Sequence, residues 1–272
     1  MIHTRRFFLV LCAATVAALW SMAPAVAPAL ADDDPWPGIR KDLFGARNIS
    51  EEDGRVVLEA PVRADDAALV PLTVRMPAEV AASIKTLTIL VDKNPAPVVA
   101  TFTFGSAAGS GERVLSTRVR IDMYSNVRAI IETADGGLHM TTKFVKAAGG
   151  CSAPALKDAD EALASIGKMQ IKTLQPGSSA PMREAQVMIR HPNYSGLQMN
   201  QLTGFYIPAK FVSEIDVRRG DDVIFHMEGG ISLSEDPNIR FTYAGGTDAP
   251  LEAVAKDTDG KVFTARSTAG GA

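Results

Sequence analysis

The residue with the clearest capacity for chemistry in this sequence is Cys151, in the stretch Gly149-Gly150-Cys151-Ser152-Ala153-Pro154. Glycine before the cysteine and proline after it predict a connecting segment and not a regular element. Glycine removes side-chain bulk and permits unusual backbone angles, so we expect an exposed thiol. An exposed thiol can act as a nucleophile that binds cargo covalently. The alternative is a cysteine that serves as a small buried hydrophobic residue.

The first 31 residues have the pattern of an export signal. Arg5-Arg6 precede an apolar run over residues 7–20, and Ala29-Leu30-Ala31 forms a small-x-small cleavage site. The arginine pair also resembles a twin-arginine motif, but Val10 stands where lysine is usual, so Tat and Sec export both stay open. Cleavage would remove Cys12 and leave Cys151 alone in an oxidising compartment, where a single cysteine indicates a reactive thiol or an intermolecular pairing.

Length and composition narrow the class of protein. The chain has 272 residues, 46% of them hydrophobic, which gives enough core for one large or two small domains. The formal net charge is −3, and the absence of a dominant basic patch argues against nucleic-acid binding. After signal cleavage we expect no membrane span, because no other stretch is long and apolar enough.

The rest of the chain is dominated by short β-like runs with turn signals between them. The signal Asp135-Gly136-Gly137 separates one such pair of runs, and Asp257-Thr258-Asp259-Gly260 separates another. Many short strands without a long helix predict antiparallel β-sandwiches. The predicted strands are residues 55–60, 69–76, 87–91, 98–104, 114–123, 127–132, 138–145, 169–174, 185–190, two short strands within 206–217, 223–227, 238–244, 251–256 and 261–267.

The two halves resemble each other, since both close with a hairpin that runs into paired glycines. We therefore predict an all-β protein with a signal peptide at 1–31, a sandwich at 32–148, a cysteine-bearing linker at 149–168 and a second sandwich at 169–272. Within the first sandwich, residues 39–44 are expected to form a helical turn, and Trp36 is expected to anchor the N-terminal arm.

The linker contains a predicted short helix. Leu156, Ala159, Leu163 and Ile166 fall on one helical face, with Ser152 as N-cap and Gly167 at the C′ position. Cys151 would then precede a helix N-terminus, whose partial positive charge lowers a thiol pKa.

The sequence gives little indication of metal, nucleotide or dithiol chemistry. The histidines His139, His191 and His226 lack the spacing of a zinc site and are interpreted as structural or surface residues. A Cys–His pair with Cys151 stays open, because such pairs meet only in space. No nucleotide-binding or CxxC motif is present, so we expect no catalytic residue, no metal and no tightly bound cofactor.

Several residues together resemble the periplasmic sulfur-oxidation carrier pair SoxY and SoxZ fused into one chain, and more closely the SoxYZ-like carriers associated with quinoprotein (PQQ-dependent) dehydrogenases. The SoxY-like residues are Asp34-Pro35-Trp36-Pro37, residues 61–76 and Gly149-Gly150-Cys151. The SoxZ-like residues are His191-Pro192, residues 207–212, Gly229-Gly230-Ile231-Ser232, Asp236-Pro237-Asn238 and Phe241.

The resemblance implies immunoglobulin-like sandwiches, a SoxY–SoxZ interface within the chain and a carrier arm, Gly149-Gly150, whose Cys151 bears cargo covalently. It implies a periplasmic, non-catalytic protein that serves a PQQ dehydrogenase or sulfur-oxidation enzymes such as those of thiosulfate oxidation, with a sulfur adduct on Cys151. One departure stands out. In the standalone carrier the motif ends the chain, whereas here Ser152-Ala153-Pro154 and a second domain follow.

Three functions remain open from the sequence. The first is a thiol carrier with a sulfur group or another adduct on Cys151. The second is a non-covalent binding or assembly factor for the dehydrogenase, with an incidental cysteine. The third is a thiol enzyme or redox protein that pairs Cys151 with a histidine.

Overall fold

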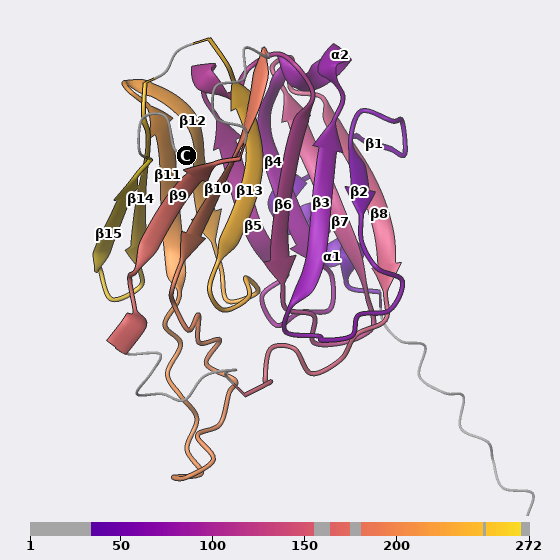
Figure 1. Cartoon of the computed structure of the whole chain (residues 1–272). Coiled ribbons are helices and arrows are strands. Elements are labelled where there is room, and N and C mark those ends of the chain that lie inside the picture. Colours follow the sequence, from indigo (N-terminus) through magenta and orange to yellow (C-terminus); the bar gives the residue numbers. More distant parts are fainter. Residues whose placement is uncertain (1–33, 155–163, 175–180, 247–248, 268–272) are drawn as a thin grey trace, which may run out of the picture. The chain divides into compact units, whose positions relative to one another are not determined.

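Alternation of apolar and polar residues produces most of the strands, because successive side chains of a strand point to opposite faces of its sheet. In β3 (Val70–Met76), every second residue is buried. The structure is a computed structural model that describes residues 34–154, 164–174, 181–246 and 249–267 (Figure 1). The predicted signal peptide and most of the predicted linker helix lie outside these residues.

The described residues of the first half form two short α-helices, one 3-10 turn and eight strands. They are α1 (Trp36–Phe44), β1 (Ile49–Glu51), β2 (Val57–Glu59), β3, α2 (Ala78–Ala81), β4 (Ile84–Val91), β5 (Val98–Phe104), η1 (Ser106–Ala108), β6 (Arg113–Val119), β7 (Ser125–Thr133) and β8 (Leu138–Val145).

Seven strands lie in the part of the second half that the structure describes. They are β9 (Met169–Thr173), β10 (Met182–Ile189), β11 (Val212–Arg219), β12 (Asp222–Gly229), β13 (Asn238–Ala244), β14 (Leu251–Asp257) and β15 (Val262–Arg266). The prediction of two short strands within residues 206–217 is wrong. Only β11 forms in this range, and the preceding residues make single bridges, such as that of Met199 with Tyr206.

Two sheets run through both halves of the chain. The larger has the order β1-β8-β7-β4-β5-β12-β11-β14-β15, and the smaller has the order β2-β3-β6-β13-β10-β9. Neighbours pair antiparallel except β1 and β8, which are parallel. Apart from β1, which the first half adds at the edge of the larger sheet, the described strands of the two halves correspond in mirrored order about the β5–β12 and β6–β13 pairs. The architecture is therefore two tandem immunoglobulin-like sandwiches joined edge to edge in both layers.

The seam between the halves is a continuous part of the sheets and of the core. β5 and β12 pair with Phe104 opposite Phe225, and β6 and β13 pair with Leu115 opposite Phe241. The rings of Phe102 and Phe225 lie edge to face at 5.5 Å, which joins the two halves by an aromatic contact as well. One hydrophobic cluster contains residues of both halves, so the sandwiches share a core.

The two hairpins predicted from turn signals are confirmed. β7 pairs with β8 around Gly136, and β14 pairs with β15 around Gly260, and both glycines have positive φ. The predicted helical turn at residues 39–44 is also confirmed as part of α1, and Trp36 packs against a small cluster under β7 and β8. Among the described residues, no helix has the length and apolar character of a membrane span.

Candidate functional site

The Gly149-Gly150-Cys151 segment follows β8 and lies against the connection between β6 and β7. The amide of Gly149 donates to the carbonyl of Asp122 (2.8 Å), and the amide of Gly150 donates to that of Ile121 (3.0 Å). Two successive backbone hydrogen bonds hold the segment beside the first sandwich.

The two glycines are needed for different physical reasons. Gly149 has φ +80° and open space where a Cβ would lie, so its requirement is conformational. At Gly150 a Cβ would lie 2.1 Å from the carbonyl oxygen of Ala67, so its requirement is steric. Gly150 therefore lets the segment approach the neighbouring backbone more closely than any other residue could.

Cys151 lies between the two halves and is held from both. Its amide donates to Asp122 Oδ1 (3.3 Å), from the first half, and its carbonyl accepts from Ser195 Oγ (2.5 Å), from the second. Gln198 Nε2 donates to the carbonyl of Ala153 at 2.9 Å. Ser195 and Gln198 belong to the β10–β11 connection, which extends beyond the strand ends in Figure 1.

Burial overturns the expectation of an exposed, activated thiol. Cys151 has 0% of its surface exposed. Burial raises the pKa of its thiol to about 12; the charge of Asp122 adds to the rise, and the guanidinium of Arg120 opposes it. The prediction of an exposed thiol with a lowered pKa is therefore wrong for this conformation, because Gly150 serves close packing here.

The helix predicted after Cys151 lies largely outside the described residues. Of its expected ends, the Ser152 hydroxyl donates to the carbonyl of Gly149 (3.4 Å), and Gly167 has φ +83°. Helix-dipole activation of the thiol stays a prediction, while burial and Asp122 act in the opposite direction.

Arg120 is the cation of this site. It is 1% exposed, and its Nη1 donates to the carbonyl of Gly150 (3.2 Å) while its Nη2 donates to that of Asn193 (3.4 Å). Burial lowers the pKa of its guanidinium, against the charges of Glu235, Cys151 and Asp66. Arg120 thus connects the first half, the glycine segment and the second half through one side chain.

The three predicted structural histidines each face an aspartate. His139 Nδ1 lies 2.5 Å from Asp53, and His226 Nδ1 lies 3.1 Å from Asp216. His191 is buried; its Nδ1 accepts from the amide of Asn193 and its Nε2 lies 3.6 Å from Asp257.

No histidine is among the groups that shift the pKa of Cys151, and the described residues contain no cluster of three or more metal-ligand side chains. The geometry gives no support to a Cys–His pair.

Sequence reasoning missed Arg120, Asp122, Ser195 and Gln198. Asp122 and Arg120 lay inside a predicted strand, and the other two lay in a polar loop, so neither their type nor their spacing marked them. These four residues contact the cysteine segment only because the chain folds back on itself, and local sequence patterns do not predict where it does so.

Comparison with known families gives two successive matches. The model of the sulfur oxidation protein SoxY matches residues 40–151, and that of the sulphur oxidation protein SoxZ matches residues 172–268. No match is found among curated proteins.

Two solved structures show similarity to parts of the chain. One is the sulfur carrier protein SoxY from Chlorobium limicola f thiosulfatophilum, which is 23% identical, with 42% of this chain and 91% of that chain covered and a TM-score of 0.34. The other is a tetra-tandem repeat in the extending region of a large adhesion protein, which is 16% identical, with 78% of this chain and 47% of that chain covered and a TM-score of 0.26.

Proposed function

Because the chain is a fused SoxYZ-like protein, with a SoxY segment followed by a SoxZ segment, we propose that it carries a sulfur species covalently on Cys151. A sulfur-oxidation carrier is the role of the family pair; the attachment to this cysteine is the proposed step. One observation carries it: the SoxY match ends at residue 151, on the cysteine that follows Gly149-Gly150.

The carrier works in two conformations in this proposal. In the closed one, Cys151 is buried and its thiol stays protonated at neutral pH, so it does not react. The contacts that close it are individual hydrogen bonds: Asp122 accepts one from the Cys151 amide, and Ser195, Gln198 and Arg120 each donate one to a carbonyl oxygen of the segment. Each such bond contributes only about 0.5–1.5 kcal/mol, so a partner that binds the segment can replace them.

Loading is an oxidative or a displacement reaction of the thiol. In the oxidative form, Cys151 sulfur bonds to the outer sulfur of thiosulfate, the thiol proton goes to solvent, and two electrons pass to a haem-containing electron acceptor. In the displacement form, the thiolate attacks an S–S bond of a polythionate, and the departing sulfur anion takes the electron pair. The protein itself then acts as carrier, with turnover left to its partner enzymes.

The proposed setting is the periplasm. The export signal pattern at residues 1–31 supports it, and the partners are periplasmic sulfur-oxidation enzymes or a quinoprotein (PQQ-dependent) dehydrogenase. The sequence resemblance to quinoprotein-associated carriers supports the second partner. Co-purification from the periplasm distinguishes the two sets of enzymes.

One observation favours a second function, that of a non-covalent assembly factor with an incidental cysteine. The complete burial of Cys151 and its raised pKa are what a purely structural cysteine has. In that case the Cys151→Ser protein keeps full function.

Intact-mass spectrometry of the protein isolated from its native periplasm tests the carrier function. We expect a fraction of molecules with a sulfur-containing mass increment on Cys151 that a phosphine reductant removes, and no increment on the Cys151→Ser protein. An unmodified thiol under sulfur-oxidising conditions, with full complementation by Cys151→Ser, contradicts the carrier function and supports the assembly factor.

A further inference from the structure

Arg120 is buried beside the cysteine, and no carboxylate of the described residues is in hydrogen-bond contact with it. Within the described residues, its two hydrogen bonds go to the backbone carbonyl oxygens of Gly150 and Asn193, and its Nε has no partner there. A buried guanidinium normally keeps a paired anion, because an unpaired charge is costly to remove from water. The described contacts of Arg120 therefore leave donor capacity for an anionic group.

Among the described residues, Arg120 is the only cation in the set of charged groups that shift the pKa of the Cys151 thiol. Asp122 raises the pKa of the Cys151 thiol, and Arg120 is the cation that lowers it. The charges of Asp66 and Glu235 act on Arg120, so the other side chains named as acting on Cys151 and Arg120 are acidic. Without Arg120, an anion attached to Cys151 would lose the one cation that acts on this thiol among the described residues.

We propose that Arg120 binds the anionic end of the Cys151 conjugate and selects sulfur oxyanions, such as a sulfonate-terminated adduct, over neutral adducts. The inference rests on the proposed carrier function and assigns one side chain to the recognition of its anionic cargo. When the segment opens, Nη1 exchanges the carbonyl of Gly150 for a sulfonate oxygen, and Nε supplies a second donor. The planar guanidinium fork suits an oxyanion, and charge-assisted bonds are stronger than the carbonyl bonds they replace.

The preference is measured in the purified full chain with two thiol reagents, one anionic and one neutral. Tetrathionate is a dianion: the Cys151 thiolate attacks a central sulfur, a new S–S bond forms, the central S–S bond breaks, and thiosulfate leaves with the electron pair. Methyl methanethiosulfonate is neutral: the thiolate attacks its methylthio sulfur, and methanesulfinate leaves. In both reactions the thiol proton goes to solvent and no further oxidant is needed.

The measured quantity is the ratio of the two modification rates, followed by mass spectrometry. The neutral reagent reports how often the segment opens, so the ratio isolates the effect of charge. We expect Arg120→Gln to lower the ratio of tetrathionate to neutral rate by at least about tenfold, from the loss of a charge-assisted contact. Arg120→Lys, which keeps the charge, should retain most of the ratio.

Arg113→Gln is the matched control. Arg113 is also buried, also donates to backbone carbonyl oxygens, of Ile84 and Gly109, and lies at the other end of β6. The substitution changes the net charge by the same amount. It should leave the ratio within about twofold of the original, a level set by distant surface charge alone.

An equal change of both rates in Arg120→Gln would overturn the inference, because it would reduce Arg120 to a structural role. A fall of the ratio in Arg113→Gln as large as in Arg120→Gln overturns it as well. The carrier function fails separately, through an unmodified Cys151 in the native periplasm. A preserved ratio effect with no native adduct therefore rejects the carrier and keeps the anion preference as a property of the site.

Discussion

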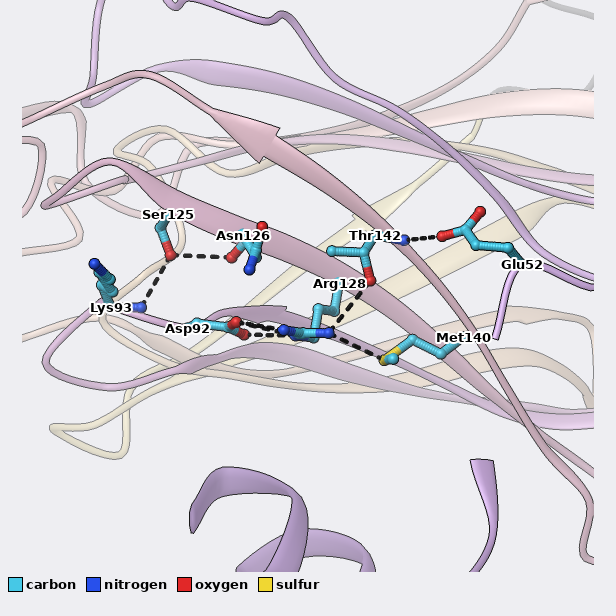
Figure 2. A network of polar contacts seen from close by, with 8 residues as sticks. All are labelled: Glu52, Asp92, Lys93, Ser125, Asn126, Arg128, Met140 and Thr142. Carbon is cyan, nitrogen blue, oxygen red and sulfur yellow. Dashed lines mark hydrogen bonds and ion pairs between the residues drawn. The ribbon is translucent and has the colours of Figure 1, made fainter. Parts of the chain in front are cut away.

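Two buried arginines in the first half are packed in opposite ways. Arg128, in β7, makes hydrogen bonds of 2.8 to 3.0 Å to both carboxylate oxygens of buried Asp92, and its guanidinium lies 4.1 Å from the centre of the Trp36 ring. Figure 2 shows this side chain between Asp92 on one side and Thr142 and Met140 on the other. In the described part of the chain, Arg120 instead makes two longer bonds, both to carbonyl oxygens.

The difference separates a fixed charge from an exchangeable one. A buried ion pair with short bidentate geometry is disrupted at high cost when one partner is removed, so the Arg128 site is a permanent part of the fold. Bonds to carbonyl oxygens can be exchanged for bonds to another acceptor at little cost, so the Arg120 site can change partners. The Cys151 segment is hydrogen-bonded to Arg120, the arginine that can change partners.

The largest expected effect is in the fixed pair. Asp92→Asn leaves the Arg128 charge buried without its anion, and we expect the free energy of unfolding to fall by about 3–5 kcal/mol. Urea denaturation measures it. Glu59→Gln, which removes an exposed partner of Arg75, is the control and should cost about 0–1 kcal/mol. A loss at Asp92 no larger than at Glu59 would remove the distinction between the two arginine sites.

The steric requirement at Gly150 is the next test. Gly150→Ala places a Cβ against the carbonyl of Ala67, and overpacking of this kind costs about 1–3 kcal/mol. We expect the segment to open and Cys151 to react with iodoacetamide at least about fivefold faster. Gly149→Ala meets no neighbouring atom and strains only φ, so its effect should be smaller. The reverse order of the two effects would mean that backbone conformation, not close packing, keeps the segment closed.

The contacts from the second half should have a moderate effect on the same rate. Ser195→Ala removes the donor to the carbonyl of Cys151, and we expect about fivefold faster iodoacetamide labelling, because one hydrogen bond is worth about 1 kcal/mol. The control is Gln201→Ala, whose side chain bonds only within the same loop, to the carbonyl of Met199. Equal labelling of both variants and the unaltered protein would show that the second half does not hold the thiol.

Of these predictions, the raised pKa of the Cys151 thiol has the smallest effect at neutral pH. Burial raises the pKa of Cys151 from 9.0 to about 12, so labelling of the native protein should keep rising with pH in this interval, whereas labelling of the urea-unfolded chain levels off near the lower value.

The direction in which stability changes with pH follows from proton binding to the Cys151 thiol. The folded state holds the thiol proton more tightly, so this contribution is present below pH 9.0 and is lost as the pH rises toward about 12. A native labelling profile that levels off near the ordinary pKa would place the thiol in solvent, contrary to its observed burial.

The sequence by itself determined the local architecture of the protein. Alternating residues such as those of β3 specify strands, and the glycines at positions 136 and 260 specify hairpins, since both signals act within a few residues. The residues around Gly149-Gly150-Cys151 and His191-Pro192 were also sufficient to indicate the fused SoxYZ-like family, which the two family matches confirm.

Only the tertiary structure decided how the two sandwiches join and where the thiol lies. Alternation states which face of a strand is buried but not which strand pairs with it, so the β5–β12 and β6–β13 seams were not predictable. Asp122 and Ser195 lie 29 and 44 residues from Cys151 in the chain and reach it only after both sheets have formed. For the same reason the sequence predicted an exposed arm at Gly149-Gly150, whereas in the structure Gly150 permits the close packing of the segment in which Cys151 is buried.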